Sequence, residues 1–104
     1  MPPGRIPSYS LEAIKATVGR GRYFITRRAG TDAAALLFDE DDIKDCVLGL
    51  RERDFYKTMP SRSIEGLYQD VYRCRHRGLA IYAKLQITDA GCAVVMSFKR
   101  DERA

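Results

Sequence analysis

The segment LAIYAKLQIT, residues 79–88, decides the fold because two kinds of side chain alternate along it. Its odd-numbered positions are all apolar, whereas its even-numbered positions include Tyr82, Lys84 and Gln86. Successive side chains of a β-strand point to opposite faces of a sheet. The segment therefore predicts a strand with one face in a core and the other face open.

The neighbouring segments have the same two-residue period. CAVVMSFKR (92–100) follows across the short loop DAG (89–91), and we expect Val94, Met96 and Phe98 to face the core. Upstream of the turn HRG (76–78), the predicted strands are LYQDVYRCR (67–75) and DFYKTM (54–59), joined by the polar loop PSRSIEG (60–66). Runs of this kind separated by short turns predict an antiparallel meander.

The first half of the chain has helical spacing instead. A helix is expected from a cap at Ser8 or Ser10 to Gly19 or Gly21, and a short strand at YFIT (23–26). A second helix lies within 27–37, with Thr31 or Asp32 as an alternative cap, and a third begins at the acidic run from Asp39. The order of elements predicts an α+β fold with N-terminal helices packed on one face of a mainly antiparallel β-sheet.

Length and composition limit the class of protein. We expect the 104 residues to form one domain, 1–104, with residues 1–7 as an N-terminal arm. We expect no membrane span and no secretory signal, and hence a cytoplasmic protein. The three cysteines have no zinc-like spacing, which favours reduced thiols and no metal site.

Charge is unevenly distributed along the chain. The formal net charge is +4, but five acidic residues gather between Asp39 and Asp45 around a single lysine, so the remainder is more basic than the total indicates. A basic body of this kind suits a polyanion such as a nucleic acid. The acidic run itself is typical of a helix N-terminus in solvent.

Alternation also brings polar residues together. Tyr82 and Lys99 are expected on the open face of the sheet, and Lys57 and Gln69 are candidates to join them from the two preceding strands. Placing Gln69 there turns Asp70 towards the core. Either backbone amides or a basic neighbour would then hold Asp70, or a bulge would reverse the alternation.

These residue types suit one reaction in particular. RNA carries its own nucleophile, the 2′-hydroxyl, so a protein needs only to align it, stabilise charge on the phosphate and move protons. Lysine, arginine, glutamine and tyrosine do this without metal or cofactor, although neighbouring cations would have to lower the pKa values of tyrosine and lysine for either to act as a base. Interleaved tyrosines can stack on unpaired bases, which favours single-stranded RNA; the candidates are Tyr56, Tyr68, Tyr72 and Tyr82. Ordinary solvated side chains are the alternative interpretation.

DFYKTM, QDVYR, GLAIYAK and VVMSFK, in this order and spacing, resemble the MqsR (motility quorum-sensing regulator) family of bacterial toxins from toxin–antitoxin pairs. PSYSLEAIK and DDIKDCVLGL also fit, so that the resemblance spans roughly residues 7–100. It implies a RelE-like fold and a ribosome-independent endoribonuclease that cuts mRNA at short GC-containing sites such as GCU. It also implies a cognate MqsA-like antitoxin with a zinc-binding domain and a helix-turn-helix domain, through which operator DNA would be bound.

The resemblance also assigns roles. It implies catalytic positions at Lys57 of DFYK, Gln69 of YQDVY and Tyr82 of AIYAK. Tyr56, Arg73 and Lys99 are the candidates for binding RNA, and no residue is assigned to a metal. Three residues depart from those more usual in the family, namely Pro60, Tyr68 and Cys74. A module that binds RNA or its antitoxin without cutting is the alternative function.

Overall fold

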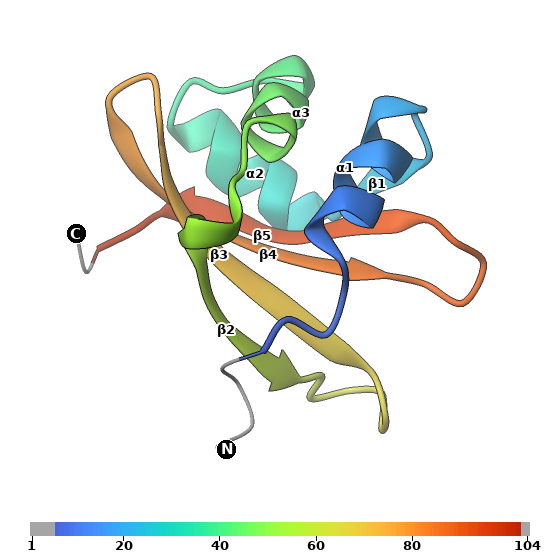
Figure 1. The fold of residues 1–104 in the computed structure, drawn as a ribbon. Coiled ribbons are helices and arrows are strands. Elements are labelled where there is room, and N and C mark those ends of the chain that lie inside the picture. The colour runs from blue at the N-terminus through green and yellow to red at the C-terminus, as the bar shows by residue number, and fades with distance from the viewer. Residues whose placement is uncertain (1–5, 103–104) are drawn as a thin grey trace.

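The computed structural model describes residues 6–102, in which three helices cover one face of a five-stranded sheet (Figure 1). The helices are α1 (Leu11–Gly19), α2 (Arg27–Ala35) and α3 (Glu40–Leu48), followed by the short 3₁₀ turn η1 (Glu52–Asp54). The strands are β1 (Tyr23–Ile25), β2 (Phe55–Pro60), β3 (Tyr68–His76), β4 (Leu79–Ile87) and β5 (Ala93–Arg100). The predicted α+β class is confirmed. Of the predicted arm, residues 1–5 lie outside the described range.

The sheet has the order β1-β5-β4-β3-β2. β2 to β5 form the predicted antiparallel meander, and β1 pairs in parallel with β5 at the edge. Within residues 6–102 no helix is both long and apolar enough to cross a membrane.

Side-chain caps explain where the helices begin. Ser10 caps α1 by accepting a hydrogen bond from the backbone of Ala13, as one of the two predicted caps. The cap of α2 is Thr26, whose hydroxyl accepts from the backbone N–H of Ala29 at 3.1 Å, rather than Thr31 or Asp32. Asp39 and its N3 residue, Asp42, form a reciprocal capping box at α3.

The core lies between the helices and the sheet. Ile81, Ala83 and Leu85 are buried there, which confirms the alternation predicted for β4. Tyr72 is also buried in the core, with its ring edge-on to Phe55 at a centroid distance of 5.6 Å. Tyr72 is therefore a packing residue, and its prediction as a base-stacking tyrosine is wrong. The helices contribute the apolar side chains of Ile14, Val18, Ile43 and Val47.

A bulge in β5 overturns part of the predicted core. Lys84 of β4 pairs with Ser97, but Leu85 pairs with Val95, so that Met96 is an extra residue on β5. Ala93, Val95 and Phe98 consequently face the helices and are buried, whereas Val94 and Met96 are only partly buried and lie outside the core cluster. The prediction for Phe98 is confirmed, and the prediction for Val94 and Met96 is wrong.

Asp70 shows how β3 keeps its regular alternation. Its side chain is fully buried on the helix side of the sheet. The carboxylate accepts hydrogen bonds from the backbone N–H groups of Ser8 and Tyr9 at 3.0 and 2.9 Å. Of the two alternatives, backbone amides hold the buried charge, and β3 pairs with both of its neighbours without a bulge beside Asp70.

Candidate active site

The side of the sheet opposite the helices is here called the open face, and its side chains form cross-strand rows. In antiparallel strands, paired residues point to the same side. One row contains Arg73, Tyr82 and Lys99, because Arg73 pairs with Tyr82 and Tyr82 pairs with Lys99. The next row is Lys57, Val71, Lys84 and Ser97, and the third includes Met59, Gln69, Gln86 and Val94. Neighbouring rows are two residues, or about 7 Å, apart.

A cavity of about 330 Å³ opens beside the first row. Lys57, Tyr82 and Lys99 line it together with Tyr56. The ammonium group of Lys99 lies 5.1 Å from the centroid of the Tyr82 ring, within the range of a cation–π contact. The cavity thus brings together two of the three predicted catalytic residues and two of the three predicted RNA-binding residues.

A second bulge explains why Tyr56 reaches this cavity. Phe55 pairs with Tyr72 and Lys57 pairs with Val71, so that Tyr56 is the extra residue in β2. Phe55 turns to the core while both Tyr56 and Lys57 reach the cavity. The ammonium of Lys57 lies 5.4 Å from the centroid of the Tyr56 ring.

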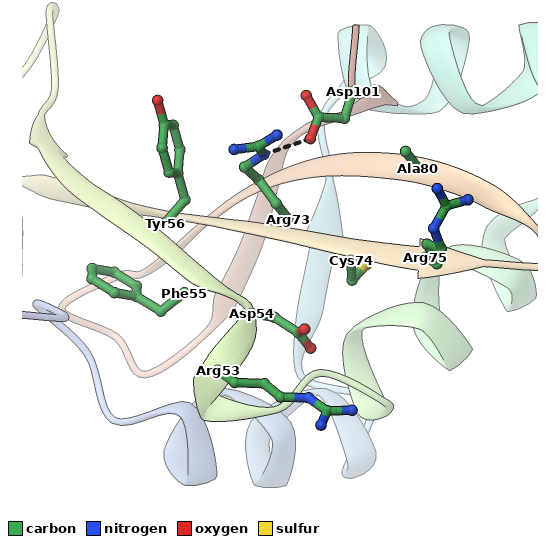
Figure 2. Close-up of a pocket in the computed structure, with 9 residues that line it drawn as sticks. All are labelled: Arg53, Asp54, Phe55, Tyr56, Arg73, Cys74, Arg75, Ala80 and Asp101. Atoms are coloured by element: carbon green, nitrogen blue, oxygen red, sulfur yellow. Dashed lines mark hydrogen bonds and ion pairs between the residues drawn. The ribbon is translucent and has the colours of Figure 1, made fainter. Parts of the chain in front are cut away.

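Arg73 is held in place by two neighbours (Figure 2). Its Nε donates to a carboxylate oxygen of Asp101 at 2.6 Å, and its guanidinium lies 5.0 Å from the centroid of the Tyr56 ring. Asp101 is buried and is fixed by its own backbone N–H, which donates to the carbonyl of Ala80. The ion pair raises the pKa of Arg73, so the guanidinium stays charged. Asp101 was not found from the sequence, since it follows the last strand and belongs to no periodic pattern.

Gln69 shares the open face but not the cavity. Its amide Nε2 donates to Oε1 of Gln86 at 3.1 Å, and the side chain is buried. It lies four positions before Arg73 on β3, which corresponds to about 13 Å along the strand. Gln69 therefore lies two rows from Tyr82, with the row of Lys57 and Lys84 between them.

Lys84 is the functional candidate that sequence reasoning missed. It stands in the central row of the open face and is partly buried. Burial lowers the pKa of its ammonium group, and the nearby charges of Lys99, Arg62, Lys57 and Arg28 lower it further. A lysine of lowered pKa among other cations is typical of a functional site. Alternation placed Lys84 on the open face, but its burial depends on neighbours from other strands.

The described residues 6–102 contain no group of three or more His, Cys, Asp or Glu side chains arranged to hold a metal ion. The open face offers ammonium, guanidinium, phenol and amide groups instead. It can bind a phosphate backbone, stabilise added negative charge and exchange protons.

The fold and the open face define a small α+β protein with a basic, tyrosine-bearing sheet surface, a charge pattern that suits a polyanionic ligand. Comparison with known proteins is more specific. Residues 6–100 match the family described as motility quorum-sensing regulator, toxin of MqsA. The chain is 37% identical over 95 residues to the "mRNA interferase toxin MqsR" of Escherichia coli (strain K12), an alignment that covers 91% of this chain and 95% of that protein. The chain therefore belongs to the MqsR toxin family, and its architecture is consistent with a RelE-like fold.

Proposed function

We propose that this protein is the toxin of a toxin–antitoxin pair and acts as an mRNA interferase. It would cut single-stranded mRNA at short GC-containing, GCU-like sites, without the ribosome and without a metal ion. The support is its family membership, the activity named for its relative, and one structural observation: Lys57, Tyr82 and Lys99 line a single cavity on the open face.

The proposed reaction is a transesterification within the RNA. The 2′-oxygen attacks the adjacent phosphorus, the bond from phosphorus to the 5′-oxygen breaks, and the products are a 2′,3′-cyclic phosphate and a 5′-hydroxyl. A proton leaves the 2′-hydroxyl and a proton is delivered to the departing 5′-oxygen, so that two groups must act as base and acid. Tyr82 and Lys57 share proton transfer and charge stabilisation in this proposal, with the division of roles open.

Lys84 and Lys99 complete the proposed site. Lys99 binds a phosphate beside Tyr82, and Arg73, held by Asp101, contacts the RNA backbone with its remaining N–H groups. Lys84 stands beside the row of Tyr82, and its lowered pKa gives it a larger neutral fraction than an ordinary lysine has at the same pH. We therefore add Lys84 as a candidate proton acceptor.

Gln69 takes a modified role. Because it lies about 13 Å along β3 from Arg73, it would meet the RNA next to the scissile phosphate rather than at it. Tyr56, between Lys57 and Arg73, would present its ring to an unpaired base.

The test is cleavage of a short single-stranded RNA containing GCU, in excess chelator, with the products identified by mass. We expect a cyclic phosphate end and a loss of rate of about 100-fold or more for Lys57→Ala and Tyr82→Phe. Arg20→Ala is the matched control, because it removes an exposed cation just after α1. Full activity of both site variants, or activity that vanishes with the chelator, would refute the proposal.

The proposed partner is an MqsA-like antitoxin with a zinc-binding domain and a helix-turn-helix domain, and operator DNA would be reached only through it. The family description, a toxin of MqsA, supports this partner. Expression of the chain alone, with and without the antitoxin encoded beside it, separates the enzyme from a non-catalytic binding module. Growth arrest that requires Tyr82 supports the enzyme, whereas harmless expression with tight antitoxin binding supports the module.

A further inference from the structure

Two cysteines that are distant in sequence meet on the helix side of the sheet. Cys46 comes from α3 and Cys74 from β3, and their sulfur atoms lie 3.4 Å apart. Both thiols are free. A disulfide bond is about 2.05 Å long, so the two sulfur atoms must approach each other by about 1.3 Å for the bond to form.

The two thiols differ in the direction in which their pKa values are shifted. The pKa of Cys46 is raised by its hydrogen bond with Cys74 and by burial. The pKa of Cys74 is lowered by the same hydrogen bond, against the opposing effects of burial and of Asp54. The thiolate is the nucleophile in thiol–disulfide exchange. Because Cys74 is partly exposed whereas Cys46 is buried, a reagent reaches Cys74 first, which makes Cys74 the attacking sulfur and Cys46 the resolving one.

A cavity gives reagents a route to this pair. It has a volume of about 400 Å³, and both cysteines line it together with Arg51, Arg53 and Arg75. Asp45 and Asp54 also line it, which leaves the arginines in excess. Figure 2 shows Cys74 and Arg75 at consecutive positions of β3 with their side chains extending in different directions, and Arg53 projecting from the preceding turn. A cavity with this lining favours a small reagent that carries carboxylates.

We propose that Cys46 and Cys74 form a reversible redox site that reacts with an anionic low-molecular-weight disulfide. The Cys74 thiolate attacks one sulfur of the reagent, forms a mixed disulfide and releases one reagent thiolate. Cys46 then loses its proton and attacks the Cys74 sulfur, which expels the second thiolate. The protein loses two protons and two electrons, and the reagent is reduced to two thiols. This inference does not depend on the proposed cleavage of RNA.

The cross-link would enclose the chain from Cys46 to Cys74, which contains η1, β2 and most of β3. Lys57 and Gln69 lie inside this loop. Closing the loop restricts the unfolded chain, so oxidation is expected to stabilise the fold.

The experiment treats the full chain with glutathione disulfide and follows its intact mass. We expect loss of two hydrogens, a peptide linking Cys46 to Cys74, and a rise in melting temperature of roughly 10 °C that dithiothreitol reverses. Cys92→Ala is the matched control and should behave as the unaltered protein does. Cys46→Ala should stop at a stable mixed disulfide on Cys74, whereas Cys74→Ala should leave Cys46 unmodified.

Reagent charge tests the role of the arginines. Arg75→Gln should slow the reaction with glutathione disulfide by about two- to fivefold, the size expected for one exposed charge pair. Its rate with neutral hydroxyethyl disulfide should change less. The proposal is overturned if Cys92 enters disulfides as readily as Cys74, or if only cross-links between chains form. Equal slowing of both reagents by Arg75→Gln would overturn the assigned reagent class.

Discussion

Replacing Asp70 with asparagine should loosen the segment before α1 from the sheet. The buried carboxylate accepts from two backbone N–H groups, those of Ser8 and Tyr9, at 3.0 and 2.9 Å. Asparagine keeps one acceptor oxygen but turns an NH₂ group towards the second amide. Losing one charge-assisted hydrogen bond costs about 1.5–3 kcal/mol, and the unpaired donors add to this. We expect Asp70→Asn to lower the free energy of unfolding by about 2–4 kcal/mol.

Urea denaturation at neutral pH measures this loss as a lower midpoint with an unchanged slope. Ser8→Ala is the control, because it keeps the backbone donor and removes only the exposed hydroxyl contact with Thr58. Hydrogen exchange localises the effect, and in Asp70→Asn the amides of Ser8 and Tyr9 should lose protection. An unchanged midpoint, or an equal loss in Ser8→Ala, would show that the carboxylate does not anchor this segment.

Three further changes test the open face and the acidic helix start. Since burial lowers the pKa of Lys84, its ammonium group opposes folding at neutral pH. Lys84→Met should therefore raise the urea midpoint while reducing RNA cleavage. A fall in both the urea midpoint and the cleavage rate would contradict a functional role for Lys84. The pKa of Asp42 is lowered by hydrogen bonding at Asp39 and by the 2.7 Å ion pair with Arg77. The carboxylate therefore stabilises the fold fully above its ordinary pKa of 3.8, and this stabilisation is lost as the pH falls through the lower pKa of the folded protein. Urea midpoints at pH 7 and pH 3 should therefore differ less in Arg77→Gln. Neutralising a phosphate-binding lysine, as in Lys57→Gln, should reduce the salt slope of binding to single-stranded RNA by about 0.7, and an unchanged slope would remove that lysine from the RNA path.

The sequence predicted the fold wherever the two faces of a strand differ in polarity. β4 is the clearest case, because Ile81 and Leu85 alternate with Tyr82 and Lys84. The start of β5 carries no such signal, because residues 93–96 are all apolar and either alternate pair could face the core. Packing against the helices selects the bulge. Contacts between distant segments could not be predicted from the sequence either, because neither the Cys46–Cys74 pair nor the position of Asp101 belongs to a periodic pattern.

The two bulges have a common consequence for the open face. In an unbroken β2, Tyr56 and Lys57 would point to opposite sides, and one of them would be lost to the core. The extra residue lets Phe55 pack inside while both Tyr56 and Lys57 line the cavity.

In β5 an unbroken alternation from Ala93 and Val95 would turn Lys99 inward and Phe98 outward. The bulge at Met96 reverses both, so that Phe98 completes the core and Lys99 reaches Tyr82. Each bulge thus lets its strand place an aromatic side chain in the core and a lysine at the cationic cavity. A strict two-residue alternation with Phe55 of β2 or Val95 of β5 in the core could not do both. Deleting Met96 removes the extra residue itself and leaves Ser97 opposite Lys84, so Phe98 should stay in the core and Lys99 on the open face of a regular strand.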